Sequence, residues 1–314
     1  MSMLAKVVLA AGSTTMGAAC VPASGAIYFY DIFYLTYYDQ VSSVPPTEYS
    51  RNSFTARMIA DPGDIGVADF SPPLAPTVAL AEIAPGYFFA EWPFFSPDLM
   101  VDAFPAGLYY FGISGGTMGF DLGEIERPEE TFWCDEIPAF SNFDDMQIID
   151  STIDFVAEFN TFSAPPPANL GVTFLSVYDS SGTLVFNEFF PPTDGSRTIP
   201  VGTLLPGRSY TAILFFSSRI ELPRVEFGGS TSIAAFDRVT SAPMFVLPTC
   251  IGDLNYDGFV DDADFVLFVP AYDLLDCADS SMPAGCPADF NRDNLVDDAD
   301  FVLFVAAYNE LLCP

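Results

Sequence analysis

The 314-residue chain has no histidine, and its only lysine is Lys6. Without histidine, the chain cannot use Ser-His-Asp or Cys-His catalysis, histidine-ligated zinc or histidine-bound haem. The net charge of −32, from 42 acidic and 10 basic residues, argues against nucleic-acid binding, because lysine and arginine must meet a phosphate backbone. We interpret the acidity as a source of solubility through mutual repulsion.

Several other signatures are missing. After the N-terminus no apolar run reaches the roughly 18 residues of a membrane-spanning helix, so no such helix is expected. The chain also lacks a glycine-rich phosphate loop and a nucleophile elbow. Adjacent acids such as Asp135 and Glu136 lie in expected loops rather than at strand ends. Enzymatic activity is therefore uncertain, and the sequence favours its absence.

The C-terminal residues contain one unit twice, with an offset of 36 positions. The run from Val260 to Val269 is identical to the run from Val296 to Val305. Each copy places oxygen-bearing side chains at loop positions 1, 3, 5, 9 and 12, a spacing that wraps a hard cation. The candidate side-chain ligands are Asp253, Asn255, Asp257, Asp261 and Asp264 in the first loop, and Asp289, Asn291, Asp293, Asp297 and Asp300 in the second.

The remaining loop positions agree with metal binding. Position 7, Phe259 or Leu295, contributes its backbone carbonyl. Position 6 must turn sharply, which Gly258 does at no steric cost, and Asn294 is the next-best residue for a left-handed conformation. Oxygen-only ligands favour calcium over zinc or copper, and magnesium prefers a smaller site in which it keeps its waters. We predict two calcium ions, one in each loop.

These loops differ from an ordinary EF-hand, because position 12 is aspartate and no amphipathic helix precedes the first loop. A duplicated loop followed by an exiting helix resembles the type I dockerin domain over about residues 253–309. The resemblance implies that the exiting helices dock a cohesin domain. At the contact positions stand Asp262-Ala263 and Asp298-Ala299 rather than small hydroxyl pairs. The partner is therefore expected to be a cohesin-like or another extracellular protein.

Four of the six cysteines follow the duplication. Cys250 and Cys286 each precede the first aspartate of a loop by three residues, and Cys277 and Cys313 each follow its last by thirteen. The simplest of the three pairings that four cysteines allow is Cys250–Cys277 with Cys286–Cys313. Cys134 is expected to be a buried thiol, with Cys20 as an alternative partner.

Residues 1–26 are typical of an export signal. Lys6 gives a minimal positive region, Val7 to Ala11 is apolar, and Ser24-Gly25-Ala26 is an acceptable cleavage site. Lipidation at Cys20 is a second alternative. Paired cysteines also point to an oxidising compartment. We expect a secreted or cell-surface protein.

The rest of the chain predicts β-structure, because aromatic and β-branched runs alternate with glycine and proline. We expect a mainly β fold, with β-sandwich domains at 27–138 and 139–248 and the small helical module at 249–314. The second sandwich is predicted to include a 172–178/183–186 hairpin and strands at 151–159, 197–201, 210–217, 224–227 and 244–247. Its strand spacing, with Tyr210 after Pro206-Gly207, resembles an immunoglobulin-like or fibronectin type III-like sandwich.

Three functions agree with this organisation. The first is calcium-dependent docking through the module, with the sandwiches as structural or adhesive parts. The exiting helices support it, because they carry apolar residues beyond the packing stripe, namely Val266, Leu267, Val302 and Leu303. The second is that of a carbohydrate-binding or carbohydrate-active extracellular protein, whose sandwiches bind a polysaccharide or other glycan on an aromatic platform of Trp92, Phe94, Phe95, Tyr109 and Tyr110. The third is a calcium-stabilised cap that has no partner.

Overall fold

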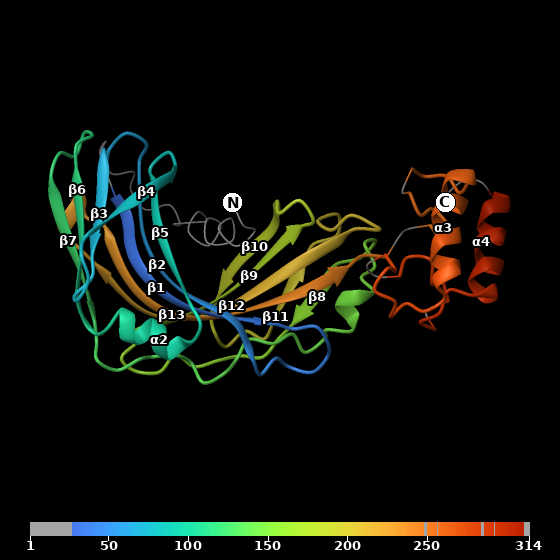
Figure 1. Cartoon of the computed structure of the whole chain (residues 1–314), viewed down its shortest axis with the longest axis horizontal. Coiled ribbons are helices and arrows are strands. Elements are labelled where there is room, and N and C mark those ends of the chain that lie inside the picture. Colours follow the sequence, from blue (N-terminus) through green and yellow to red (C-terminus); the bar gives the residue numbers. More distant parts are fainter. Residues whose placement is uncertain (1–26, 248–249, 256, 284–285, 292, 311–314) are drawn as a thin grey trace.

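The computed structural model describes residues 27–247, 250–255, 257–283, 286–291 and 293–310. The export signal predicted for 1–26 and the alternatives for Cys20 lie outside these residues. Strands make up 44% and helices 14% of the structure, so the mainly β fold with a small helical C-terminal region is confirmed. Figure 1 shows the large sheet and, beyond its far end, the two helices of the module. In the described part of the chain no helix is long and apolar enough to cross a membrane.

Eleven strands form one sheet in the order β10-β9-β12-β13-β1-β2-β5-β4-β3-β6-β7, and β11 pairs with β8 separately. The strands are β1 Ile27–Asp39, β2 Tyr49–Ala60, β3 Val67–Ser71, β4 Val78–Ala84, β5 Tyr87–Phe94, β6 Gly107–Ser114, β7 Asp121–Arg127, β8 Phe155–Glu158, β9 Leu170–Asp179, β10 Leu184–Phe190, β11 Ser196–Ile199, β12 Ser209–Pro223 and β13 Thr231–Phe245. The helices are α2 Pro97–Ala103, α3 Asp262–Leu274 and α4 Asp298–Glu310, with short 3-10 turns η1 Asp145–Gln147 and η2 Glu226–Gly228.

The sheet crosses the boundary expected at residues 138 and 139. β1 and β13, from opposite sides of that boundary, pair in parallel from Phe29 with Thr231 to Asp39 with Ser241. The division into two sandwich domains stays a prediction, but the two regions share one sheet, which we call the body (residues 27–247). The predicted hairpin is confirmed as β9 and β10. The strand expected at 224–227 is wrong, because the chain turns there through η2 around buried Phe227.

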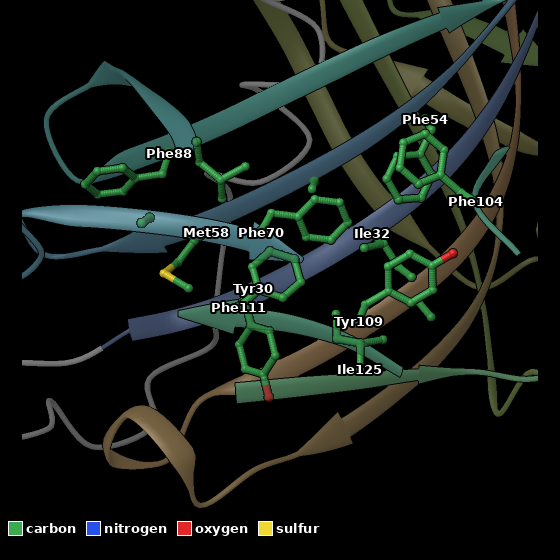
Figure 2. Packing of buried hydrophobic residues seen from close by; sticks show 14 of the residues in the cluster. Tyr30, Ile32, Phe54, Met58, Phe70, Phe88, Phe104, Tyr109, Phe111 and Ile125 are labelled. Atoms are coloured by element: carbon green, nitrogen blue, oxygen red, sulfur yellow. The ribbon is translucent and has the colours of Figure 1, made fainter. Parts of the chain in front are cut away.

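One face of the sheet carries two buried clusters. The larger is aromatic and includes Tyr34, Phe54 and Phe104, with the rings of Phe54 and Phe104 stacked 3.7 Å apart. Figure 2 shows the rings of Phe54 and Phe104 next to each other. It is enclosed because the sheet curls from β13 through β5 and β3 until β7 contacts β13 again. The other cluster lies under β9, β12 and β13 and includes Leu214 with Phe140. Cys134 belongs to it as a fully buried free thiol, as expected.

Candidate metal centre

The first loop folds around the carboxylate at its first position. Asp253 accepts hydrogen bonds from the backbone amides of Asp257 at 3.2 Å and Gly258 at 3.0 Å. The side-chain oxygen of Asn255 accepts the amide of Asp257 at 2.8 Å, and Asp257 in turn accepts the amide of Phe259 at 2.9 Å. These bonds turn alternate side chains toward the inside of the loop, as a cation-wrapping loop requires.

Position 12 of the first loop is fully buried. One oxygen of Asp264 accepts the amides of Leu254 at 2.7 Å and Asn255 at 2.9 Å, and the other accepts the amide of Asp261 at 2.9 Å. Asp261 itself is the N-cap of α3 and accepts the amide of Ala263. This capping box ties the last ligand position to the first turn of the helix.

The second loop repeats this pattern. Asp300 is fully buried and accepts the amides of Phe290 at 2.7 Å, Asn291 at 3.0 Å and Asp297 at 3.0 Å. Asp289 accepts the amides of Asp293 and Asn294, as Asp253 does in the first loop. The predicted ligand side chains are therefore brought into equivalent positions by two stretches 36 residues apart.

The two loops make the tight turn at position 6 in the same way. Gly258 has a φ of +90° and Asn294 a φ of +68°, both in the left-handed region that favours glycine and tolerates asparagine. At position 7, Phe259 and Leu295 have exposed side chains that contain no metal-binding atom. Their backbone carbonyls are therefore the donors that these positions offer.

The loop chemistry fits a hard cation. Carboxylate oxygens of Asp289, Asp293 and Asp300 lie within 4.8 Å of one another. Like charges held this close favour a bound cation, and an all-oxygen donor set suits calcium.

Helices α3 and α4 pack reciprocally. Tyr272 of α3 donates to Asp298 at 2.5 Å, and Tyr308 of α4 donates to Asp262 at 2.6 Å. Each of these bonds raises the pKa of its tyrosine, because the hydroxyl faces a carboxylate. Phe268 and Phe304, equivalent in the repeat, stack 5.2 Å apart at the centre. The two loop–helix units thus share one hydrophobic core, which consists of Cys250, Leu254, Val260, Phe268, Ala271, Ala288, Val296 and Phe304.

The symmetric disulfide pairing is wrong. Cys277 is bonded to Cys286, nine residues along the chain, rather than to Cys250. The segment after α3 turns back toward the second loop, where the Cys277 amide donates to the Asn294 carbonyl. This turn brings Cys277 beside Cys286. Cys250 is also disulfide-bonded, and Cys313 lies outside the described residues.

Each exiting helix presents apolar side chains to solvent. Val266 is 68% and Val302 66% exposed, and Leu267, Phe265 and Phe301 are exposed as well. Helix–helix packing therefore uses only part of the apolar stripe, mainly Phe268 and Phe304. Solvent-facing apolar side chains on both helices are typical of an interaction surface.

The aromatic platform predicted for glycan binding is not assembled. Tyr109 is fully buried and donates to the carbonyl of Pro105, while Trp92 and Phe94 pack against the large aromatic cluster. Phe95 is 94% exposed, and Tyr110 is 36% exposed on β6. These five residues therefore do not share one open surface.

Comparisons with known proteins do not assign a family. No protein-family model and no curated protein matches the chain. Solved structures with weak similarity include the BSP domain of a biofilm-associated protein, at 14% identity over 69% of this chain and 30% of that one, with a TM-score of 0.20. Two others are the FN1–FN3 domains of chicken CNTN1 and a bacterial ice-binding adhesin.

The CNTN1 domains are 11% identical over 60% of this chain and 64% of their own length, and the adhesin is 12% identical over 74% and 68%. Both have a TM-score of 0.21. The chain thus spans less than two thirds of the first two structures. Scores this low carry no argument about function.

Proposed function

We propose that residues 249–314 form a module that binds two calcium ions and docks an extracellular protein. One observation carries the calcium proposal: Asp264 and Asp300 are both fully buried, and each is held by three backbone amides in the same way. Three amides offset part of the cost of burying each carboxylate, and they leave about one of its four lone-pair sites for a cation. Two equivalent carboxylates at the last ligand positions are best explained by a cation in each loop.

The chain's own residues explain how calcium orders the module. The loop aspartates repel one another, and the bound ion supplies the positive charge that offsets this repulsion. Position 12 is also inside the first turn of each helix, because Asp264 lies in α3 and Asp300 in α4. A loop that closes on its last aspartate therefore fixes the start of its helix. With both helices fixed, Phe268 and Phe304 keep their stacked contact.

The proposed docking surface consists of the exposed apolar residues Phe265, Val266, Leu267, Phe301 and Val302. Because these residues follow directly on the two loops, their arrangement depends on loop closure. The partner is an extracellular protein with a complementary apolar surface, and a cohesin-like domain is one such protein. The body then serves as a structural or adhesive part of a secreted or cell-surface protein.

Equilibrium dialysis of the full chain against calcium tests the metal proposal. We expect two ions per chain, released by chelator. Fewer than two ions at saturating calcium would contradict the proposal.

Docking is tested by immobilising the full chain and exposing it to surface and secreted proteins from its source, with calcium and with chelator. We expect a protein that is retained only with calcium and is lost with the double variant Val266→Glu, Val302→Glu. The matched control is Val225→Glu in the body, where the residue is 91% exposed. If retention is equal in both variants, or absent while two ions bind, the module is a calcium-stabilised cap without a partner.

A further inference from the structure

Arg127, the last residue of β7, is a buried cation without a carboxylate partner. The residue is 3% exposed, and its Nε and Nη2 atoms are buried with no hydrogen-bond partner among the described residues. No ion pair between described residues includes it. A charge that is taken out of water is costly unless it is paired. Arg127 therefore lacks the group that would offset its burial.

Two other arginines are buried in the described part of the chain, and both have such a group. Arg57 donates through Nε to the carboxylate oxygens of Asp31 at 2.7 and 2.8 Å. Arg219 donates to the hydroxyl of Ser217 at 2.7 Å, and this hydroxyl donates to Asp237 at 2.5 Å. Each guanidinium thus reaches a carboxylate, either directly or through one hydroxyl. The buried guanidinium of β7 departs from this pattern.

The guanidinium of Arg127 rests on aromatic rings. Its central carbon lies 5.3 Å from the ring centre of Tyr34 and 5.4 Å from that of Phe236, and these two rings stack 4.4 Å apart within the large aromatic cluster. Ring faces attract a cation, but they leave the N–H groups along its edge without an oxygen acceptor. Nε and Nη2 share one edge of the guanidinium, and such an edge can donate two parallel hydrogen bonds to one carboxylate.

A row of polar side chains crosses the same face of the sheet beside these rings. Its members pair in register across three neighbouring strands: Asn52 of β2, Thr36 of β1 and Arg238 of β13. Thr36 follows Tyr34 by two residues, so the row lies next to the rings.

The polar row has unused hydrogen-bonding groups and a positive charge. The side-chain amide of Asn52 and the hydroxyl of Thr36 are both buried without a hydrogen-bond partner among the described residues. Arg238 donates to the carbonyl of Cys134 at 2.9 Å and to the hydroxyl of Tyr38 at 2.7 Å, and it adds a second guanidinium to this face. The surroundings of Arg127 therefore favour an anion.

We propose that the edge of Arg127 binds a small carboxylate of the size of formate or acetate, with the polar row beside it. Nε and Nη2 donate to the two carboxylate oxygens, and Asn52 and Thr36 are further donors in the neighbouring row. A water molecule can accept the same N–H groups, but it carries no charge, whereas a carboxylate also compensates the guanidinium. Because the donor atoms are buried, the ligand is small. The body then has a binding site that is independent of the module.

Thermal unfolding of the full chain, followed by the emission of Trp92 and Trp133, tests this proposal at fixed calcium in sodium acetate and in sodium chloride of equal concentration. We expect the midpoint to rise with acetate and not with chloride, because a ligand of the folded state stabilises it by mass action. Arg127→Gln should weaken acetate binding about 30-fold, as expected for lost hydrogen bonds to a charged group. The matched control is Arg208→Gln, at an exposed arginine of the body, which should leave binding unchanged. Equal midpoints in acetate and chloride, or equal losses in both variants, overturn the proposal.

Arg127→Lys separates the fork from the charge. Lysine keeps the positive charge but lacks the planar edge with two parallel donors. We expect this variant to lose the preference for acetate over chloride. If it binds acetate as tightly as the parent chain does, the two-point carboxylate contact is wrong.

If the Arg127 variants do not fold, the parent chain still decides the question. In the full chain labelled with ¹⁵N at arginine, an Nε–H resonance with nuclear Overhauser effects to aromatic ring protons should move as acetate is added. The Nε–H of Arg57, which is already bound to Asp31, should stay in place. If all such resonances remain fixed up to high acetate, the proposal is refuted.

Discussion

The body buries aromatic and aliphatic clusters on both faces of one sheet, whereas the module buries one small cluster around Phe268 and Phe304. The module also carries 14 of the 42 acidic residues but only one of the ten basic ones. A small domain with a small core and many like charges needs additional links. The comparison teaches that the body can hold its fold by apolar packing, while the module depends on its disulfides and, in our proposal, on calcium.

The largest expected effect is on calcium binding, which we assign to the module and not to the body, and it concerns Asp264 and Asp300. Either Asp264→Asn or Asp300→Asn should weaken calcium binding at its own loop about 100-fold, or about 2.7 kcal/mol, because position 12 loses a carboxylate. Calorimetric titration of the full chain measures this loss. Asp273→Asn, an exposed site in α3 outside the loops, is the control. An equal loss in the control would show a general charge effect.

The next largest expected effect is on the stability of the module and comes from the Cys277–Cys286 disulfide. Replacing both Cys277 and Cys286 with serine should lower the free energy of unfolding of the module by ~2.5 kcal/mol, the chain-entropy value for a loop of this length. Helix ellipticity during urea unfolding reports on the module. The urea midpoint of the body, followed by the emission of Trp92 and Trp133, should not change. A shift in both signals would mean that the two regions unfold together.

The two regions should also respond to pH in opposite directions. Burial raises the pKa of Asp237 to about 6, against the opposing attraction of Arg219 and the Ser217 hydroxyl. The folded body therefore binds this proton more tightly than the unfolded chain, whose carboxyl titrates near 3.8. The stabilisation is complete below about pH 3.8 and is lost as pH rises through 6, by up to about 1.4 kcal/mol per pH unit.

Asp237→Asn should remove this contribution, so that the difference in free energy of unfolding between variant and parent changes from pH 5 to pH 7. Tryptophan emission during urea unfolding measures it. Calcium binding to the module, by contrast, strengthens as pH rises, because its ligands must be deprotonated. A constant difference between variant and parent would contradict the pKa assignment.

The smallest effect concerns position 6 of the loops. Gly258→Ala should destabilise the module by about 1 kcal/mol, because a side chain there must adopt a positive φ. No atom lies within 4 Å of the added Cβ, so the cost is conformational alone. Asn294→Gly should stabilise the second loop by a similar or smaller amount. Urea midpoints of the module measure both, and effects of the same sign would contradict this explanation.

Sequence reasoning predicted the local features well. The loop geometry and the helices of the module follow from residue spacing within short stretches, and the β9–β10 hairpin follows from a turn at Gly182 between two apolar runs. These elements depend on neighbours in the chain.

Features that depend on distant contacts were not predicted. β13 was expected only at its end, since Ala234, Ala235 and Pro243 have low strand propensity. It forms because β1 and β12 flank it on both sides. The parallel β1–β13 pairing joins residues about 200 positions apart, which no local pattern encodes. The Cys277–Cys286 bond likewise depends on the turn after α3.

The central claim, that calcium orders the module and not the body, is tested most directly by hydrogen exchange of the full chain. Exchange is followed by mass spectrometry with calcium and with chelator. We predict that amides of α3 and α4 lose protection in chelator, while amides of β1, β12 and β13 keep theirs. If α3 and α4 remain equally protected without calcium, apolar packing and the disulfides suffice for the module, and the claim is wrong.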